Sequence, residues 1–442
     1  MSQLVNQELW TKQAEIIVAR HGSNMEFPYA FYIALDGNGL NGLEGRAGMC
    51  AFNYDPELKK YDYRIKYYDG MAGGHAVSVS PNGKVGFLGS TGQHLMFFDT
   101  HTLEEIGRVS TLWYESTNSS IKGSTHAVWV SDEEVIVAIG ESLWSININD
   151  LSNANVIAKH GLKVPHAMKR TASGKYLVYG GMDHPEEGEA KEVGILDMHT
   201  KEVRKVELPA TCWHVACHPT EDKFYALSFR VLPQGGDWHE WAISLFKEYV
   251  FEIDAVSGKV LRHWSAGQDL HAHINSDVCL SEQELIYCNG ASGTIVMIDR
   301  NDFSSFRMID ERPNFLTRLG ATRQRMRTFV DSITRGSIFT NGHFHLRALR
   351  ASRWTMLDSV YACQLSSDQK YLFTANRGLN TITVYNYPDS TVNLTVKMPS
   401  LQEYDETLKW WGDPRLGFHH STLRTTSLPK QQSANENNSL PV

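Results

Sequence analysis

Histidine recurs at one position of a repeated pattern, and these histidines are the side chains of this chain best suited to chemistry. Of 19 histidines in 442 residues, five stand at the start of a segment of alternating apolar residues. They are His75, His126, His166, His214 and His420 (or its neighbour His419). Neutral imidazole is the commonest side-chain metal ligand near neutral pH, and an all-nitrogen donor set suits Fe, Cu, Zn or Ni better than Mg or Ca. The pattern predicts a histidine-bound transition metal, Fe or Cu before Zn.

Two copies of the pattern carry a different residue at this position, namely Ser276 and Tyr361. His271 and His273 closely precede Ser276, so either imidazole could reach the same site as a further ligand or donate a proton there. The phenol of Tyr361 could also donate a proton, or its ring could be an aromatic plug. We therefore take Tyr361, His273 and His271 as the candidate catalytic residues.

Taken alone, any one of these histidines would more often be a packing residue or bond to a backbone carbonyl. Five at the same repeat position favour a shared site, because repeat similarity would preserve proline, tryptophan or alanine as readily. The histidines lie far apart in sequence, so a shared site requires a fold that arranges the copies around one axis.

The repeat predicts such a fold. The copies begin at His75, His126, His166, His214, Ser276 and Tyr361. Each contains four short segments with period-two alternation, separated by turns rich in Gly, Asn and Asp, as in antiparallel hairpins. Sheets repeating at intervals of about 40 to 85 residues indicate a β-propeller. The innermost strands of its blades would all begin at one mouth of the central channel, where the imidazoles would meet.

A seventh copy is divided between the two ends of the chain. FYIALDGNG, AGMCAFNYD and YDYRIKYYDG have the pattern of a blade's second, third and fourth strands, and the segment from Gly417 would supply the first. Pairing of the two ends would close the ring and remove two free sheet edges. We predict an all-β, seven-bladed β-propeller over residues 25–424, an N-terminal helix within residues 1–24 and a disordered tail over residues 425–442.

Tyr371-LFTANRGLNTITVYNY and the turn Ser80-PNGK resemble the YVTN-type repeats of seven-bladed propellers. Their superfamily includes quinoprotein amine dehydrogenase heavy chains. The resemblance covers nearly all of the chain at the level of the repeat and implies the seven-bladed fold. It implies no particular function, because related propellers include many lyases and binding proteins.

The long insertions fall in connections that meet at the histidine end of the predicted channel. They are residues 111–125, 182–192, 232–248, 312–354 and 401–417. Loops gathered around one channel mouth are how a scaffold builds a site. Their many aromatic residues predict a covered pocket for a small apolar or aromatic molecule, and residues 312–357 are predicted to form a helical lid, or otherwise an outer brace or a subunit contact. Asp183, Glu240 and Glu115 are candidate bases or supports for ligand histidines.

Composition excludes several classes of partner. A formal net charge of -8 argues against nucleic acid or an anionic membrane surface. No run approaches the roughly 18 apolar residues of a membrane span, and the first residues lack the basic start and apolar core of a secretory signal. The six cysteines form no Cys-x-x-Cys pair. We expect a cytoplasmic protein with reduced thiols, and the oligomeric state stays open.

Three functions fit these features. The first is an intracellular metal-dependent oxidoreductase or oxygenase, acting on the small molecule under the lid. The second is a lyase or cyclase in which His and Tyr act as acid and base. The third is a protein-interaction propeller without catalysis. Long insertions over the channel mouth favour the two enzymes over the third.

Overall fold

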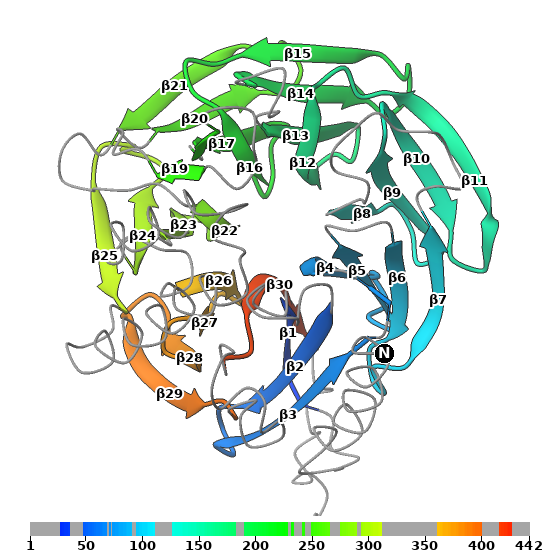
Figure 1. Cartoon of the computed structure of the whole chain (residues 1–442). Helices are drawn as coiled ribbons and strands as arrows, with labels where there is room; N and C mark the ends of the chain where they lie inside the picture. Colours follow the sequence, from blue (N-terminus) through cyan, green and yellow to red (C-terminus); the bar gives the residue numbers. More distant parts are fainter. Residues whose placement is uncertain are drawn as a thin grey trace, which may run out of the picture.

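The computed structural model describes fourteen stretches of the chain. They are residues 27–35, 47–68, 70–71, 73–90, 94–110, 126–182, 190–228, 231–233, 241–243, 249–265, 275–289, 293–311, 360–399 and 415–426, with the backbone alone for 231–233, 241–243 and 275–276. The elements in these stretches are all strands. They form seven four-stranded antiparallel sheets, the blades, arranged around one axis (Figure 1). The predicted all-β, seven-bladed propeller is confirmed.

The first three blades follow the order of the chain, except that the first takes its inner strand from the C-terminal end. Blade 1 consists of β30 (Phe418–Thr425), β1 (Tyr29–Leu35), β2 (Gly48–Asp55) and β3 (Lys60–Tyr67). Blade 2 consists of β4 (Gly74–Val79), β5 (Val85–Ser90), β6 (His94–Asp99) and β7 (Glu105–Ser110). Blade 3 consists of β8 (Ala127–Trp129), β9 (Glu134–Ile139), β10 (Ser142–Asn147) and β11 (Asp150–Lys159).

The other four blades repeat this arrangement from the inside outward. Blade 4 consists of β12 (Val164–Arg170), β13 (Tyr176–Met182), β14 (Glu192–Asp197) and β15 (Val203–Glu207). Blade 5 consists of β16 (Cys212–Cys217), β17 (Lys223–Ser228), β20 (Tyr249–Asp254) and β21 (Val260–Ser265). Blade 6 consists of β22 (Asn275–Leu280), β23 (Glu284–Asn289), β24 (Thr294–Asp299) and β25 (Phe306–Asp310). Blade 7 consists of β26 (Val360–Leu365), β27 (Tyr371–Asn376), β28 (Thr381–Asn386) and β29 (Thr391–Lys397).

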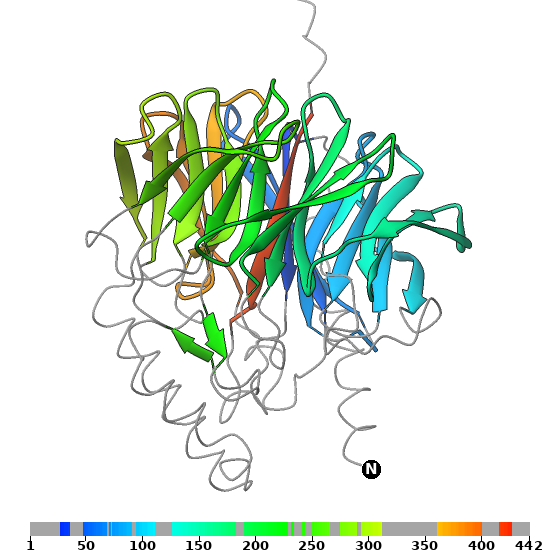
Figure 2. The same ribbon diagram turned by 90° about the horizontal axis from the view of Figure 1, so that it is seen from above.

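Strand direction gives the disc two different faces. All seven inner strands begin on one face, here called the histidine face, so connections between blades and between second and third strands attach there. The connections on the opposite face are short turns; Gly83 in the predicted Pro-Asn-Gly turn has φ 74°, a conformation that suits glycine. The two-stranded sheet of β18 (Val231–Pro233) and β19 (Trp241–Ile243) lies off the histidine face (Figure 2). The predicted insertions therefore join strand ends on a single face.

The predicted helices have no counterpart in the described stretches. The helix within residues 1–24 and the whole of the 312–357 lid lie outside the described residues, as does the tail from residue 427 onward. Thr425, predicted to begin the disordered tail, is instead the last residue of β30, because it pairs with Tyr29. The described part of the chain has no helix with the length and apolarity that a membrane span requires.

Pairing between the two ends of the chain closes the ring, as predicted. β1 is hydrogen-bonded to β2 on one side and to β30 on the other, with Tyr29 opposite Thr425 and Ile33 opposite Ser421. The apolar side chains of β1 also pack against blade 7, where the rings of Phe31 and Phe373 lie 5.7 Å apart. Both rings are fully buried, so the closure is stabilised by core packing as well as by backbone hydrogen bonds.

This packing predicts the effect of removing one ring. Phe31→Ala should lower the free energy of unfolding by about 3–5 kcal/mol because it leaves a cavity between blades 1 and 7. Val392→Ala on the outer strand β29, where the side chain is exposed, should change it by less than about 0.5 kcal/mol. Urea unfolding followed by circular dichroism checks both, and equal effects would contradict the role of this core in closing the ring.

Candidate metal centre

A β-bulge at the start of the inner strand directs the side chains of the histidine face. In blade 2, Gly74 pairs with Ser90 and Val77 with Leu88, so His75 and Ala76 together oppose one residue. A comparable register shift occurs in the first two strands of six of the seven blades. The bulged pairs are His75–Ala76, His166–Ala167, Trp213–His214, Ser276–Asp277, Tyr361–Ala362 and His419–His420. Bulges commonly re-aim side chains next to functional sites. In blade 3, His126 directly precedes β8.

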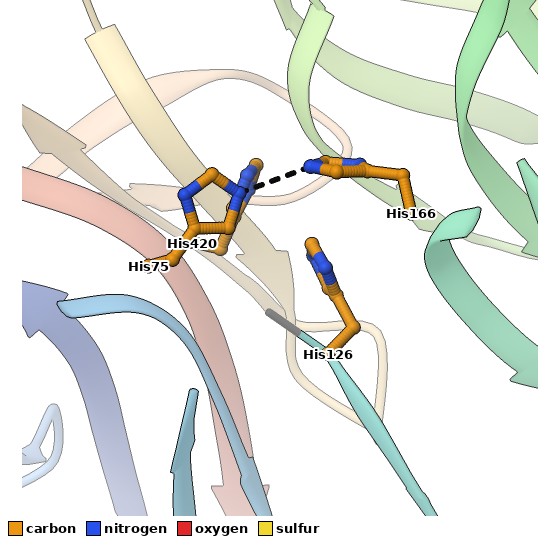
Figure 3. Close-up of side chains that lie close together, drawn as sticks. All are labelled: His75, His126, His166 and His420. Carbon is orange, nitrogen blue, oxygen red and sulfur yellow. Dashed lines mark hydrogen bonds between the residues drawn. The ribbon is translucent and has the colours of Figure 1, made fainter. Parts of the chain in front are cut away.

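Four of the five predicted ligand histidines converge on one point. His75, His126, His166 and His420 come from four consecutive blades, and one ring nitrogen of each lies within 4.8 Å of the others (Figure 3). Nε2 of His75 and Nε2 of His166 are 3.0 Å apart, although the two residues are 91 positions apart in sequence. His166 and His420 are buried, and His75 and His126 are partly exposed.

The fifth predicted ligand, His214, flanks this group. Its ring centre lies 5.0 Å from that of His166 and 4.9 Å from that of His420. Its side chain is buried. His214 is the second residue of its bulge, so Trp213 stands at the position that His75 occupies in blade 2. Counting back from the turn prolines Pro81 and Pro219 would have revealed this offset.

His419 and His420 both join the cluster, although the sequence led us to expect only one of them. Because the bulge sets both residues against Ala34, two neighbours in one strand can turn towards the same axis. The His419 ring centre lies 4.1 Å from that of His75 and 4.5 Å from that of Tyr361. Six imidazoles therefore lie together around the axis, with the Tyr361 ring at their edge.

The remaining candidate residues are less well defined. The side chain of Ser276 is not described, and His271, His273, Asp183, Glu240 and Glu115 lie outside the described residues. Tyr361 is buried, and its ring centre is 5.7 Å from that of His420. The inner strands of blades 6 and 7 contribute no imidazole to the cluster, so within the described residues the ligand set is one-sided.

Burial keeps five of the six imidazoles neutral. It is the main cause that lowers the pKa of His75, His126, His214 and His419 well below the usual 6.5, and the neighbouring imidazoles lower it further. Burial also lowers the pKa of His166 to about 3, with a further contribution from His420. Neutral imidazole is the form that binds metals, so these five side chains are in the metal-binding form at neutral pH.

One hydrogen bond fixes the tautomer of His166. Its Nδ1 lies 3.2 Å from the carbonyl oxygen of Trp213, and because a carbonyl only accepts, Nδ1 must donate. Nε2 of the neutral ring then carries no hydrogen, so it accepts the 3.0 Å hydrogen bond that Nε2 of His75 donates; a metal ion would replace this bond. Such a bond from the second ring nitrogen to a carbonyl is typical of metal-ligating histidines.

The spacing of the nitrogens fits a metal ion. Two nitrogens bound at about 2.1 Å, at right angles to each other, lie about 3.0 Å apart, which is the separation of Nε2 in His75 and His166. Opposite ligands at the same bond length lie about 4.2 Å apart, so small ring rotations would bring four nitrogens within 4.8 Å of one another onto one ion. The group could hold a metal ion.

Comparison with known proteins adds little to this account. No protein-family model matches the chain, and no curated protein matches it in sequence. Hydrazine synthase of Kuenenia stuttgartiensis is similar in structure, with a TM-score of 0.48 and 14% identity over 71% of this chain and 76% of that one. The WD40 domain of Neurospora crassa Pan2 has a TM-score of 0.44 and 12% identity over 72% of this chain and 78% of that one. Likenesses this distant carry no functional argument, so the fold is assigned from its strand pairing.

The lowered pKa values predict acid sensitivity of the metal-free protein. Below about pH 6.5 the unfolded histidines bind protons that the folded cluster excludes, so stability falls as the pH drops. Each such histidine contributes about 1.4 kcal/mol per pH unit to this slope. His166→Gln removes one such histidine. The slope of the free energy of unfolding against pH should therefore be smaller by about this amount between about pH 6 and pH 4.

Urea unfolding in the presence of a chelator measures this slope. His101→Gln, at an exposed position in the turn between β6 and β7, is the matched control and should leave the slope as in the wild type. If His166→Gln also has the wild-type slope, His166 is not held neutral by burial.

Proposed function

We propose that this protein is a metal-dependent oxidoreductase whose metal ion is held by His75, His126, His166 and His420, with His214 as a further donor. The observation that carries the proposal is the convergence of four imidazole nitrogens from four blades within 4.8 Å. A propeller needs no histidine at these positions to close, and clustered basic groups destabilise the metal-free fold at low pH. A bound metal ion would explain why histidines occupy these positions, which packing alone does not.

The donor set favours iron or copper. Imidazole suits Fe, Cu, Zn and Ni, whereas hard cations such as Mg require oxygen ligands. An uncharged donor set in a buried site also favours the oxidation state of lower charge, because burying charge is costly. Reduced iron or copper, when bound, supplies electrons to dioxygen or a peroxide. Zinc fits the same nitrogens, and with zinc the centre would instead polarise a substrate for lyase chemistry.

The chain's own residues would divide the work around this ion. His166, oriented by the Trp213 carbonyl, would present Nε2 as a fixed ligand. The side of the axis at blades 6 and 7 has no described imidazole ligand, so we infer that a substrate would approach the site from this side. Tyr361 of blade 7 lies there, next to His419 and His420, and its phenol would donate a proton to bound substrate. His271 and His273, which precede blade 6 in the sequence, are further candidate proton donors.

The substrate we propose is a small apolar or aromatic molecule. The support is that the connections reaching the histidine face include the aromatic-rich insertions of the sequence, and that ligand pockets are commonly lined by aromatic side chains with few polar groups. The lid assigned to residues 312–357 would exclude water from this pocket.

Metal retention tests the ligand assignment. Protein purified without a histidine tag after growth with added iron or copper should hold close to one equivalent of metal. His126→Ala combined with His166→Ala should reduce this to less than about a tenth of an equivalent, because two of the four ligands are lost. Elemental analysis measures the content, and circular dichroism should show an intact β-propeller.

The matched control combines His101→Ala with His263→Ala, two exposed histidines on the turns and outer strands. This pair should leave the metal content unchanged. Metal-free wild-type protein, or retention equal in the two double variants, would refute the proposal.

Reaction with hydrogen peroxide tests the redox role and the function of Tyr361. The reduced, metal-loaded protein should be oxidised by peroxide, which takes up electrons and protons to give water. Tyr361→Phe should keep its metal and react about 100-fold more slowly, the lower range for loss of a general acid. Stopped-flow absorbance measures the rate, and Tyr179→Phe, which alters a buried tyrosine of β13, is the control.

Two outcomes would contradict these assignments. A wild-type rate in Tyr361→Phe would make the ring an aromatic plug rather than a proton donor. A metal-loaded wild type that reacts with neither peroxide nor dioxygen would exclude the oxidoreductase and favour the lyase.

A further inference from the structure

A buried carboxylate lies beside one of the four clustered histidines. Asp277, on β22, is the second residue of the Ser276–Asp277 bulge, and only 9% of it is exposed. Its Oδ1 lies 3.8 Å from Nδ1 of His420. Blade 6, which has serine at the histidine position, thus places a carboxylate next to a ligand from blade 1.

The other carboxylate oxygen is held by three donors. Oδ2 accepts hydrogen bonds from the Ser421 backbone N–H at 3.0 Å, from the Ser421 hydroxyl at 2.5 Å and from Gln364 Nε2 at 3.3 Å. Gln364 Nε2 also donates to the Ser421 carbonyl at 3.1 Å. The carboxylate is therefore fixed to the strand that carries His420, with Oδ1 left to face the imidazole.

His420 lacks a hydrogen-bond acceptor for Nδ1 among the described residues. Its side chain is 4% exposed, and within the described part of the chain its buried Nδ1 makes no hydrogen bond. A buried N–H without an acceptor destabilises the folded protein. A neutral imidazole carries one N–H, so a metal at Nε2 requires the hydrogen to be on Nδ1, the atom nearest Asp277. A movement of about 1 Å would bring the two atoms into hydrogen-bond distance.

We propose that Asp277 is a positioning residue that accepts the Nδ1–H of His420 and so presents Nε2 to the metal ion. A carboxylate in this role fixes the ring orientation, increases the basicity of the ligand and adds negative charge to an otherwise uncharged donor set. The effect on metal binding rests on the proposed function. The effect on the His420 tautomer does not, because the movement of about 1 Å that would form this hydrogen bond requires no metal ion.

Asp277→Asn is a sharp test because the amide has only one acceptor oxygen. Ser421 donates two hydrogen bonds to the Oδ2 position, so the amide oxygen should take that place and the NH₂ group should face His420. Nδ1 must then accept, and the hydrogen moves to Nε2. The ligand nitrogen is blocked, and metal affinity should fall by about 10- to 100-fold.

The experiment has two readouts on the full chain. NMR of metal-free protein with isotope-labelled histidine reports the tautomer of His420, whose signal is assigned by its loss in His420→Gln. We expect the Nδ1–H form in the wild type and the Nε2–H form in Asp277→Asn. Chelator competition gives the metal affinity, and the spectrum of the Cu(II)-loaded protein should change in Asp277→Asn. Asp62→Asn, which alters a buried aspartate of the outer strand β3, should change neither readout.

The outcomes separate this inference from the proposed function. An Nε2–H tautomer of His420 in the wild type, or the same tautomer in folded Asp277→Asn, overturns the role of Asp277. If Asp277→Asn does not fold, the wild-type tautomer decides alone. A wild type that binds no metal refutes the proposed function, while the tautomer readout still decides whether Asp277 orients His420.

Discussion

The pairing of β30 with β1 is the interaction on which the rest of the structure depends. It joins the two ends of the chain and closes seven blades around one axis, so the starts of all inner strands meet. His420 reaches the axis on β30 itself and lies beside His75, with ring centres 4.9 Å apart. An open array of the same blades would keep its local cores but not this convergence. Closure therefore provides both the stability of the sheet edges and the candidate metal centre.

The histidine cluster lowers the stability of the metal-free fold at low pH, and a bound metal ion would stabilise it. Burial disfavours the charged form of His75, His126 and His166, so these imidazoles lie together in the interior as neutral rings. Functional sites commonly retain such arrangements at the expense of stability. In the metal-bound protein the imidazoles would coordinate one ion. Metal binding would also be coupled to folding, because the ligands come from separate blades.

Much of the fold followed from periodicity, because turn residues and alternation recur in every blade and even the divided blade keeps three consecutive strands. The finer geometry of the site did not follow. A bulge has no reliable signature in one sequence, yet it decides that His419 and His420 both face the axis. Asp277 was equally hidden, because its link to His420 crosses from blade 6 to blade 1 and no local pattern records such a contact.

X-ray absorption spectroscopy of the metal-loaded protein tests the central claim most directly, because it counts the atoms bound to the ion. Four or five nitrogen neighbours at about 2.0–2.1 Å, with the outer-shell scattering of imidazole rings, would agree with this account. A shell containing sulfur, or one of oxygen atoms without imidazole scattering, would mean that the ion lies elsewhere and that the clustered histidines are not its ligands.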